Sequence, residues 1–256
     1  MEKFFDTHAH YTDEKLAGNL ALTDELFATN ISDIICVSID NDDADKCIAL
    51  AKRYPHMYVG AGIHPSECMR FPSIDDEMER LRTICRDEKV VAIGEIGLDY
   101  HYDFSEKEVQ KRFFEAQMCL AEELDIPVII HDREAHADVF DTVRAHPRVR
   151  GVIHSYSGSA EMAREYVKLG WYLSFSGVVT FTNAAKTHEA AKAVPLDRIL
   201  IETDAPYLAP VPMRGKMNHS GYICYTAKKI AELHDTDIDT VARVTAENAK
   251  TLFRIK

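Results

Sequence analysis

The amino-acid sequence predicts an α/β fold, a TIM (β/α)8 barrel formed by a single domain with a C-terminal helix. Short apolar runs typical of buried strands alternate with amphipathic stretches typical of helices. Eight such runs occur, at a spacing close to the ~30 residues of a strand–helix–strand unit. The chain has 256 residues, the usual size of one barrel. Because strictly alternating units form a parallel sheet, eight of them most simply close into a barrel.

The predicted strands share a short apolar core, which a strand buried on both faces requires. They begin near Phe4, Ile34, Met57, Val90, Pro127, Gly151, Trp171 and Arg198. A doubly wound open sheet is the alternative fold. The sequence has neither a G-x-G-x-x-G motif after the first strand nor a Walker motif, which argues against a nucleotide cofactor. No linker or repeat interrupts residues 1–256, so we expect one domain.

The clearest helical pattern covers residues 106–124, where Val109 and Phe113 lie on one apolar face. Ser105, followed three residues later by Glu108, predicts a capping box at the start of this helix. Similar patterns predict further helices over residues 42–54, 74–87, 159–169 and 222–233, and a last helix over 238–253. The predicted helices therefore lie between the predicted strands, as a barrel requires.

Composition and charge narrow the possible location and partners. The six cysteines form no C-x-x-C pair, which favours reduced thiols and a cytoplasmic protein. We expect no signal peptide, because Glu2 and Asp6 are acidic and no apolar h-region follows, and no membrane span, because no apolar run approaches roughly 20 residues. The net charge of −12 argues against non-specific coating of duplex nucleic acid. It leaves a phosphate substrate possible, because bound metal ions would add local positive charge.

His8 and His10 follow the apolar residues Phe4 and Phe5 in the first predicted strand. Residues two apart in an extended segment point to the same side, so the two imidazoles can converge on one point. Imidazole is the commonest neutral metal ligand. The pair therefore indicates a metal site, and the alternative is two surface histidines just past a strand.

Other polar residues come at the expected ends of later strands, where barrel active sites are built. These residues are His64, Glu95, His131, His154 and Asp204. Four imidazoles, from His8, His10, His131 and His154, together with two carboxylates suit two adjacent divalent ions, and one carboxylate could bridge them. The alternatives are a hydrogen-bonded core histidine at His64 and a plain salt-bridge partner at Glu95.

Six ordered motifs extend over nearly the whole chain. They are Asp6-x-His8-x-His10, Gly62-Ile63-His64-Pro65, Gly94-Glu95-Ile96-Gly97-Leu98-Asp99-Tyr100, Pro127-Val128-Ile129-Ile130-His131, His154-x-x-Ser157-Gly158 and Glu202-Thr203-Asp204-Ala205-Pro206-Tyr207-Leu208. Together they resemble the TatD family of metal-dependent deoxyribonucleases, which belong to the amidohydrolase-like barrels. The resemblance implies a TIM barrel, divalent metals and hydrolysis of phosphodiester bonds in DNA, often from the 3′ end.

The resemblance also implies roles for individual residues. His8, His10 and Asp204 would hold one ion. His131 and His154 would hold the second ion, and Glu95 would bridge the two. His64 would lie beside the leaving or product phosphate. We further expect Asp204 to accept the proton of the attacking water, because a carboxylate beside a metal site is well placed for general-base work.

The chain departs from the family pattern at three places. Ser66 stands where the family often has a second histidine, and Ser155-Tyr156 replaces a Cys-Phe pair after His154. In the segment from Arg214 to Gly221, His219-Ser220 replaces a common Glu-Pro pair. We expect this segment to lie over the pocket and to affect substrate preference rather than metal binding.

Substrate contacts are predicted from residue type alone. Arg133 and Arg214 offer guanidinium forks to phosphate oxygens, and the alternative is exposed or structurally paired arginines. Phe181, Tyr207 and Tyr100 could stack on bases, although packing roles are the commoner alternative. The remaining histidines are expected to be surface or structural: His56, His101, His136, His146, His188 and His234.

Three functional hypotheses follow. The first is a deoxyribonuclease with two divalent ions, acting on single strands, ends or short phosphodiesters and binding long duplex weakly. The second is an amidase- or lactonase-type hydrolase. Such enzymes often use a carboxylated lysine after the fourth strand. This chain has Glu95 at that position, and its nearby lysine, Lys89, lies at the start of the strand. The third is a non-catalytic metal-binding scaffold. The donor set suits Zn²⁺, Mn²⁺ or Fe²⁺, with Mg²⁺ held loosely, and no obligate protein partner is expected.

Overall fold

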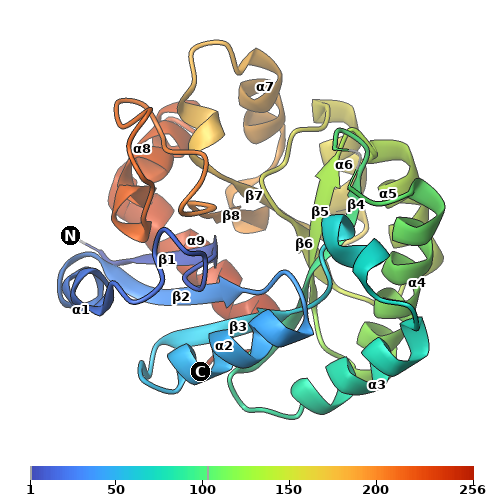
Figure 1. Cartoon of the computed structure of the whole chain (residues 1–256). Helices are drawn as coiled ribbons and strands as arrows, with labels where there is room; N and C mark the ends of the chain where they lie inside the picture. The colour runs from blue at the N-terminus through green and yellow to red at the C-terminus, as the bar shows by residue number, and fades with distance from the viewer. Residues whose placement is uncertain (1, 103) are drawn as a thin grey trace. The chain divides into compact units, whose positions relative to one another are not determined.

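The computed structural model describes residues 2–102 and 104–256 (Figure 1). The chain divides into two compact units, which we describe separately. The first unit comprises Met1–Cys36 and His154–Lys256, and the second unit comprises Val37–Ile153. The expectation of a single domain stays a prediction.

The strands occur in the predicted places. They are β1 (Phe4–Ala9), β2 (Ile31–Val37), β3 (Met57–Ala61), β4 (Val90–Asp99), β5 (Val128–Arg133), β6 (Gly151–Ile153), β7 (Tyr172–Phe175) and β8 (Ile199–Ile201). The largest error is in β2, which begins at Ile31 rather than Ile34 because Ile31 already pairs with Phe4 of β1. Because Ser32 and Asp33 are polar, the apolar pattern of the sequence does not indicate that the strand begins at Ile31.

Helices separate the strands. They are α1 (Leu20–Thr29), α2 (Asn41–Ala51), α3 (Ile74–Ile84), α4 (Lys107–Leu124), α5 (His136–Ala145), α6 (Ala160–Lys168), α7 (Ala185–Ala193), α8 (Ile223–Leu233) and α9 (Ile238–Phe253), with short 3-10 turns η1 (Pro65–Arg70), η2 (Gly177–Thr180), η3 (Leu196–Arg198) and η4 (Ser220–Tyr222). The predicted helices are confirmed: α9 has the predicted bounds, α2 begins one residue earlier and ends three residues earlier, and the others are shorter by one to three residues. The sequence pattern gave no bounds for α1, α5 and α7, and α1 buries only Thr23 and Leu26 among its described residues.

The predicted capping box at the start of α4 is wrong. The N-cap residue is Glu106, whose side chain makes no capping hydrogen bond. The Ser105 hydroxyl instead donates to the Ser66 carbonyl at 3.0 Å and accepts from the Met69 amide at 3.2 Å. Ser105 is therefore occupied by the loop that contains η1 and cannot cap the helix.

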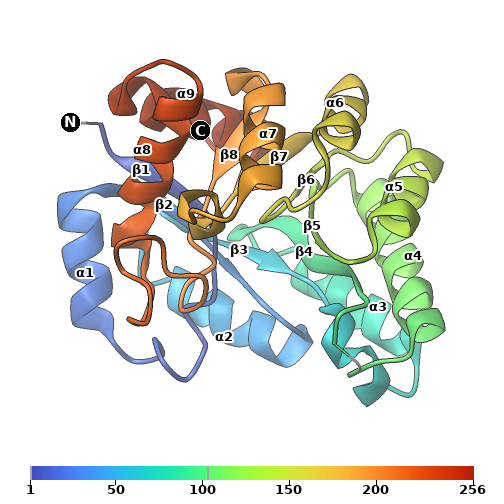
Figure 2. The same cartoon turned by 90° about the horizontal axis from the view of Figure 1, so that it is seen from above.

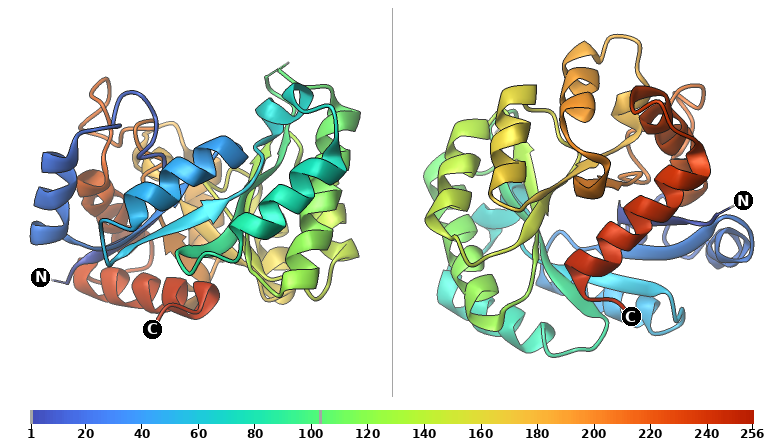
Figure 3. Two further views of the ribbon diagram at one scale, coloured as in Figure 1. Left: turned by 60° about the horizontal axis from the view of Figure 1, so that its bottom comes forward. Right: turned by 180° about the vertical axis from the view of Figure 1, so that it is seen from behind.

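In the first unit, β1 pairs in parallel with β2, and β7 pairs in parallel with β8. A parallel bridge joins Ala9, at the end of β1, to Ala205 in the segment after β8. Helix α9 packs against β1 and β8, and it is the red helix near the C-terminus in Figure 3. All residues of β1 and β7 are buried, as expected for parallel strands covered on both faces.

In the second unit, β3 pairs with β4, β4 with β5 and β5 with β6, all in parallel. Helix α4 packs on β4 and also contacts α3. Figure 2 shows α3, α4 and α5 along the outer side of these strands. The observed pairs and the alternation with helices confirm the predicted α/β class. No helix in the described part of the chain is long and apolar enough to cross a membrane.

Candidate metal centres

The first unit brings together the three residues predicted to hold one ion. His8 lies in β1 and His10 directly follows it, and their Nε2 atoms are 3.2 Å apart. The Asp204 Oδ1 atom lies 3.7 Å from His8 Nε2 and 3.5 Å from His10 Nε2. Three ligand atoms from two distant segments therefore surround one point, which fits a divalent cation.

Backbone hydrogen bonds explain why Asp204 meets the two histidines. The Asp204 amide donates to the His8 carbonyl at 2.9 Å, and the His10 amide donates to the Ala205 carbonyl at 2.7 Å. The segment after β8 thus runs beside the end of β1. Asp204 has a φ of 58°, in the left-handed region that an aspartate adopts more readily than most residues.

The charge state of Asp204 also suits a cation site. Burial acts to raise the pKa of Asp204, but a hydrogen bond with His10 and the nearby His8 and His154 imidazoles outweigh it and lower this pKa. The carboxyl group is therefore ionised at neutral pH. An ionised carboxylate beside two imidazoles is a typical ligand combination for zinc and related ions.

His154 directly follows β6, and its ring stacks on the His8 ring with centroids 4.0 Å apart. Its Nδ1 atom lies 3.1 Å from Glu202 Oε1, which also accepts the Ser155 amide at 2.8 Å. His8, His154 and Glu202 form a group that could hold an ion. Glu202 is a site residue to which sequence reasoning gave no role. The expectation that His154 shares an ion with His131 stays a prediction.

Asp6 links the β1 segment that holds His8 and His10 to the segment after β8 that holds Asp204. Its carboxylate accepts the Thr203 hydroxyl at 2.6 Å and the Thr203 amide at 3.0 Å. Burial raises the pKa of Asp6 to about 6, although hydrogen bonds from Ser220 and Thr203 act in the opposite direction. Asp6 thus has a positioning role between the His8–His10 strand and the segment that holds Asp204.

The second unit groups His64, Glu95 and His131. Glu95 Oε1 lies 2.6 Å from His131 Nδ1 and 3.7 Å from His64 Nε2. The two rings meet edge to face with centroids 4.6 Å apart. These three residues could also hold an ion. Whether Glu95 bridges two ions stays a prediction.

Two positions differ from the prediction that these residues end their strands. Glu95 lies in the middle of β4, which continues to Asp99 because its second half pairs with β5 as far as Arg133. His131 is likewise inside β5. Local apolar patterns could not show this extension, since it depends on pairing between two strands.

Asp99 is a further site residue that sequence reasoning missed. Its Oδ2 atom lies 3.1 Å from His131 Nε2, and its Oδ1 atom accepts the His101 and Tyr102 amides at 2.9 and 3.0 Å. Burial acts to raise the pKa of Asp99, but the hydrogen bond with His131 and those with the backbone lower it to about 2. His131 therefore has a carboxylate at each ring nitrogen, and such a pair attracts a cation to the imidazole.

His64 is the N-cap residue of η1, and Ser66 determines its orientation. The Ser66 amide donates to His64 Nδ1 at 3.1 Å, and the Ser66 hydroxyl lies 2.7 Å from the same nitrogen. Because Nδ1 accepts a backbone hydrogen bond, the neutral ring carries its proton on Nε2, the atom nearer Glu95. Ser66 thus fixes the tautomer of His64.

The predicted phosphate-binding arginines both lie over aromatic rings. The Arg133 guanidinium lies 4.6 Å from the centroid of Tyr102, and the Arg214 guanidinium lies 4.1 Å from that of Phe181. Tyr207 is exposed, and its hydroxyl donates to Asp13 at 2.5 Å.

Tyr100 has a different setting from the other predicted stacking residues. Its hydroxyl donates to Asp138 at 2.5 Å, and the Lys107 ammonium lies over its ring. The roles of Arg133, Arg214, Phe181, Tyr207 and Tyr100 in substrate binding stay predictions.

The segment with the His219-Ser220 exchange is tied to the first unit's site. Ser220 is buried with its hydroxyl 2.7 Å from the Tyr11 hydroxyl, and His219 Nδ1 accepts the Gly221 amide at 3.2 Å. The Asn218 amide group donates to the carbonyls of Thr203 and Tyr207. Both exchanged residues therefore have structural partners, and an effect on substrate preference stays a prediction.

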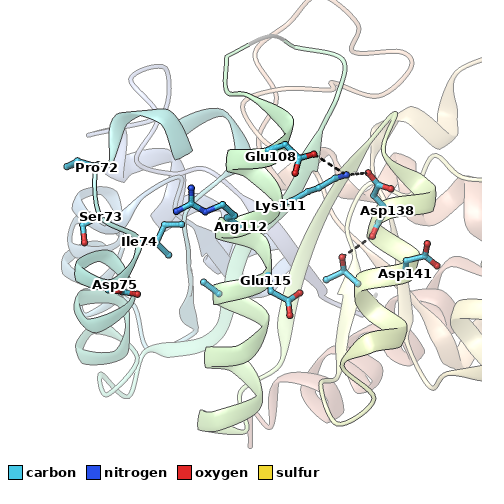
Figure 4. Close-up of a pocket in the computed structure, with 12 residues that line it drawn as sticks. Pro72, Ser73, Ile74, Asp75, Glu108, Lys111, Arg112, Glu115, Asp138 and Asp141 are labelled. Atoms are coloured by element: carbon cyan, nitrogen blue, oxygen red, sulfur yellow. Dashed lines mark hydrogen bonds and ion pairs between the residues drawn. The ribbon is translucent and has the colours of Figure 1, made fainter.

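A groove of about 830 Å³ lies elsewhere, along α3, α4 and α5 of the second unit (Figure 4). Its lining includes Glu115 as well as Lys111 and Asp138, which form an ion pair with each other. The described residues that line it include none of the predicted site residues.

Comparison with known proteins identifies the family. A family model described as TatD related DNase matches residues 5–254. YabD of Bacillus subtilis, an uncharacterized metal-dependent hydrolase, is 41% identical over 98% of this chain and 99% of its own. YcfH of Escherichia coli, named in the same way, is 39% identical over 83% of this chain and 84% of its own.

A solved structure extends this result to the fold. The crystal structure of the TatD homologue YjjV from Escherichia coli is 30% identical, covers 99% of this chain and 98% of its own, and superimposes with a TM-score of 0.92. The predicted TIM (β/α)8 barrel is thereby confirmed. The chain belongs to the TatD family of metal-dependent hydrolases.

Proposed function

We propose that this hydrolase cleaves phosphodiester bonds of single-stranded DNA from the 3′ end and uses two divalent ions. The observation that carries the proposal is the convergence of His8 Nε2, His10 Nε2 and Asp204 Oδ1 on one point. Glu95 and His131, which lie in one group with His64, supply a second set of donors. Both sets combine imidazole with carboxylate, which suits Zn²⁺, Mn²⁺ or Fe²⁺.

The first ion would be held by His8, His10 and Asp204, and the second by Glu95 and His131, with His154 as the remaining predicted ligand. When bound, such ions lower the pKa of water and stabilise charge on phosphate oxygens. Carboxylates behind the histidines support both sets, because Asp99 contacts His131 and Glu202 contacts His154. Such outer partners fix the ring orientation and raise the basicity of the ligand.

The side chains of the chain itself divide the remaining work. Asp204, ionised and with its Oδ1 close to both His8 and His10, can accept the proton of the attacking water at its other carboxylate oxygen. His64 holds its Nε2 proton because Ser66 occupies Nδ1, so it can donate a hydrogen bond to a phosphate oxygen.

An aromatic platform in the second unit supports single strands as the substrate. The rings of Tyr102 and Phe104 stack with centroids 5.3 Å apart and are 46% and 65% exposed. The Tyr102 amide binds Asp99, which also contacts His131, so the platform adjoins the proposed metal ligands. Unpaired bases stack on such rings, and Arg133 beside Tyr102 can bind phosphate.

A small-molecule amidase or lactonase is the second candidate. Many such barrels place a carboxylated lysine in the metal site. Here the Lys89 ammonium donates to the backbone carbonyls of Tyr54, Pro55 and Met57, and Lys89 lies just before the start of β4 rather than near Glu95. The carboxylate of Glu95 takes the corresponding place, which favours the phosphodiesterase.

Cleavage of a 5′-labelled single-stranded oligonucleotide tests the proposal. Metal-stripped protein would be assayed with Mg²⁺, Mn²⁺ or Zn²⁺ added back, and a Glu95→Ala variant would exclude a contaminating nuclease. We expect a metal-dependent ladder that shortens from the 3′ end and is absent in the variant. Stoichiometric metal binding without cleavage by any ion would reject the nuclease and favour an ester or amide substrate.

The proposal includes a cytoplasmic location. The six cysteines, all within the described residues, carry thiols rather than disulfides, as is usual in a reducing compartment.

A further inference from the structure

Another cluster of potential metal ligands lies on the outer side of the second unit. Glu115, Cys119 and Glu122 lie four and three residues apart on α4, a spacing that places them on one helical face. His146, the C-cap residue of α5, reaches the same place and is only 6% exposed. Figure 4 shows Glu115 on α4, the helix that passes beside α5.

Three of these side chains could share one ion. The ligand atoms of Glu115, Cys119 and His146 all lie within 4.8 Å of one another. Ligands at about 2.0–2.3 Å from a zinc ion lie within about 4.6 Å of each other. Because Glu115 and Cys119 are exposed, small rotations of their side chains suffice to close this difference.

The fourth residue, Glu122, occupies the other side of the imidazole. His146 Nε2 lies 3.1 Å from Glu115 Oε1, whereas its Nδ1 lies 3.2 Å from Glu122 Oε2. The Arg148 guanidinium donates to the other Glu122 oxygen at 2.5 Å. A metal-binding histidine typically donates its second ring N–H to a carboxylate in this way, which directs the free nitrogen at the ion.

We propose that Glu115, Cys119 and His146 bind one divalent cation of the zinc class, with Glu122 orienting His146. A thiolate ligand selects Zn²⁺, Co²⁺ or Cd²⁺ over Mg²⁺ and Ca²⁺. Three protein ligands leave a coordination position open to water or to an external group. Glu115 also lines the groove of about 830 Å³, which gives an ion access from solvent.

The thiol is the group that distinguishes this cluster from a plain set of ion pairs. Burial and the adjacent Glu115 and Glu122 carboxylates raise the pKa of Cys119, which keeps the thiol protonated. A divalent ion between the carboxylate and the imidazole reverses this effect, so binding displaces the thiol proton into solvent. None of the residues proposed for phosphodiester cleavage is a cysteine, so the two sites can be measured separately.

Titration of the metal-free full chain with Co²⁺ tests the proposal. Thiolate ligation of Co²⁺ produces a charge-transfer absorption band in the near ultraviolet, and imidazole and carboxylate ligands do not. We expect this band in the wild-type protein and its loss in Cys119→Ser. A matched Cys85→Ser variant, which removes another partly exposed thiol of the same unit, is expected to keep the band.

A second variant tests the orienting residue. Glu122→Gln is expected to weaken Co²⁺ binding by roughly 10- to 100-fold while the band remains at saturation. Absence of the band in wild-type protein with excess Co²⁺, or its persistence in Cys119→Ser, would overturn the proposal. Both results are independent of nuclease activity, so failure here and failure of the proposed function are distinguishable.

Discussion

His131 and His146 each hold a carboxylate at both ring nitrogens, yet their surroundings differ. Glu95 and Asp99 approach His131 at 2.6 and 3.1 Å, with side chains only 4% and 6% exposed. Glu115 and Glu122 approach His146 at 3.1 and 3.2 Å, and the Glu115 side chain is 57% exposed. Both carboxylates that flank His131 are therefore buried, whereas Glu115, one of the two that flank His146, is exposed to solvent.

The difference in burial determines how strongly each pair requires a cation. Two charges attract each other several times more strongly in a protein interior than in water. A buried carboxylate pair left without a cation is costly, whereas the exposed Glu115 carboxylate is solvated and the partly buried Glu122 is paired with Arg148. We therefore expect His131 to belong to the reaction centre and His146 to a weaker, exchangeable site.

Glu95→Gln is expected to have the largest effect. The amide keeps the size of the side chain but removes the charge that attracts a cation beside His131. Since bound ions supply several kcal/mol of charge stabilisation, turnover of a single-stranded oligonucleotide should fall roughly 1000-fold or more. The matched control is Glu232→Gln on α8, a half-exposed glutamate remote from both histidines in sequence. A variant that retains most of its turnover would remove Glu95 from the reaction.

Asp204→Asn should lower turnover by roughly 10²- to 10⁴-fold, the usual contribution of a general base. Substrate affinity should change much less, because the amide preserves the shape of the residue beside His8 and His10. Steady-state kinetics separates the two effects as kcat and KM. Equal losses in both parameters would contradict the role of proton acceptor.

The proximity of His8 and His10 and the strand order could be predicted because both depend on local patterns. His8 and His10 lie two residues apart after an apolar run, and each strand core is a short apolar segment. The extent of β4 could not be predicted, since its last residues are held by pairing with β5.

The missed carboxylates have a similar explanation. Asp99 and Glu202 acquire their roles only when histidines 32 and 48 residues away in the sequence reach them. Their signal was an acidic residue inside or just after an apolar run, as in Gly97-Leu98-Asp99 and Ile201-Glu202. At the site of Glu115, Cys119 and His146, the spacing of Glu115, Cys119 and Glu122 on a predicted helix was a comparable signal. The contribution of His146 could not be predicted, because it depends on how α5 packs beside α4.

Asp99→Asn should weaken metal binding and turnover by roughly 10- to 100-fold, as expected for a carboxylate behind a metal ligand. The asparagine oxygen can still accept the His101 and Tyr102 amides, so the loop should keep its conformation. Isothermal titration with Mn²⁺ and parallel assays measure the two losses, and Asp141→Asn in α5 is the exposed control. A loss of turnover at unchanged metal affinity would exclude the proposed support of His131.

Tyr102→Ala tests whether the aromatic platform of Tyr102 and Phe104 binds bases. We propose base binding for this platform beside His131, and none for the site formed by Glu115, Cys119 and His146. Removing one stacking ring costs about 1–3 kcal/mol per base, so KM for a single-stranded oligonucleotide should rise roughly 5-fold or more. Hydrolysis of bis(p-nitrophenyl) phosphate in Tyr102→Ala and the ring-preserving Tyr102→Phe completes the test. A nitrophenyl ring could also stack, so the informative quantity is the larger loss on the oligonucleotide. If both substrates lose activity equally, Tyr102 supports the site through the Asp99 loop and does not bind bases.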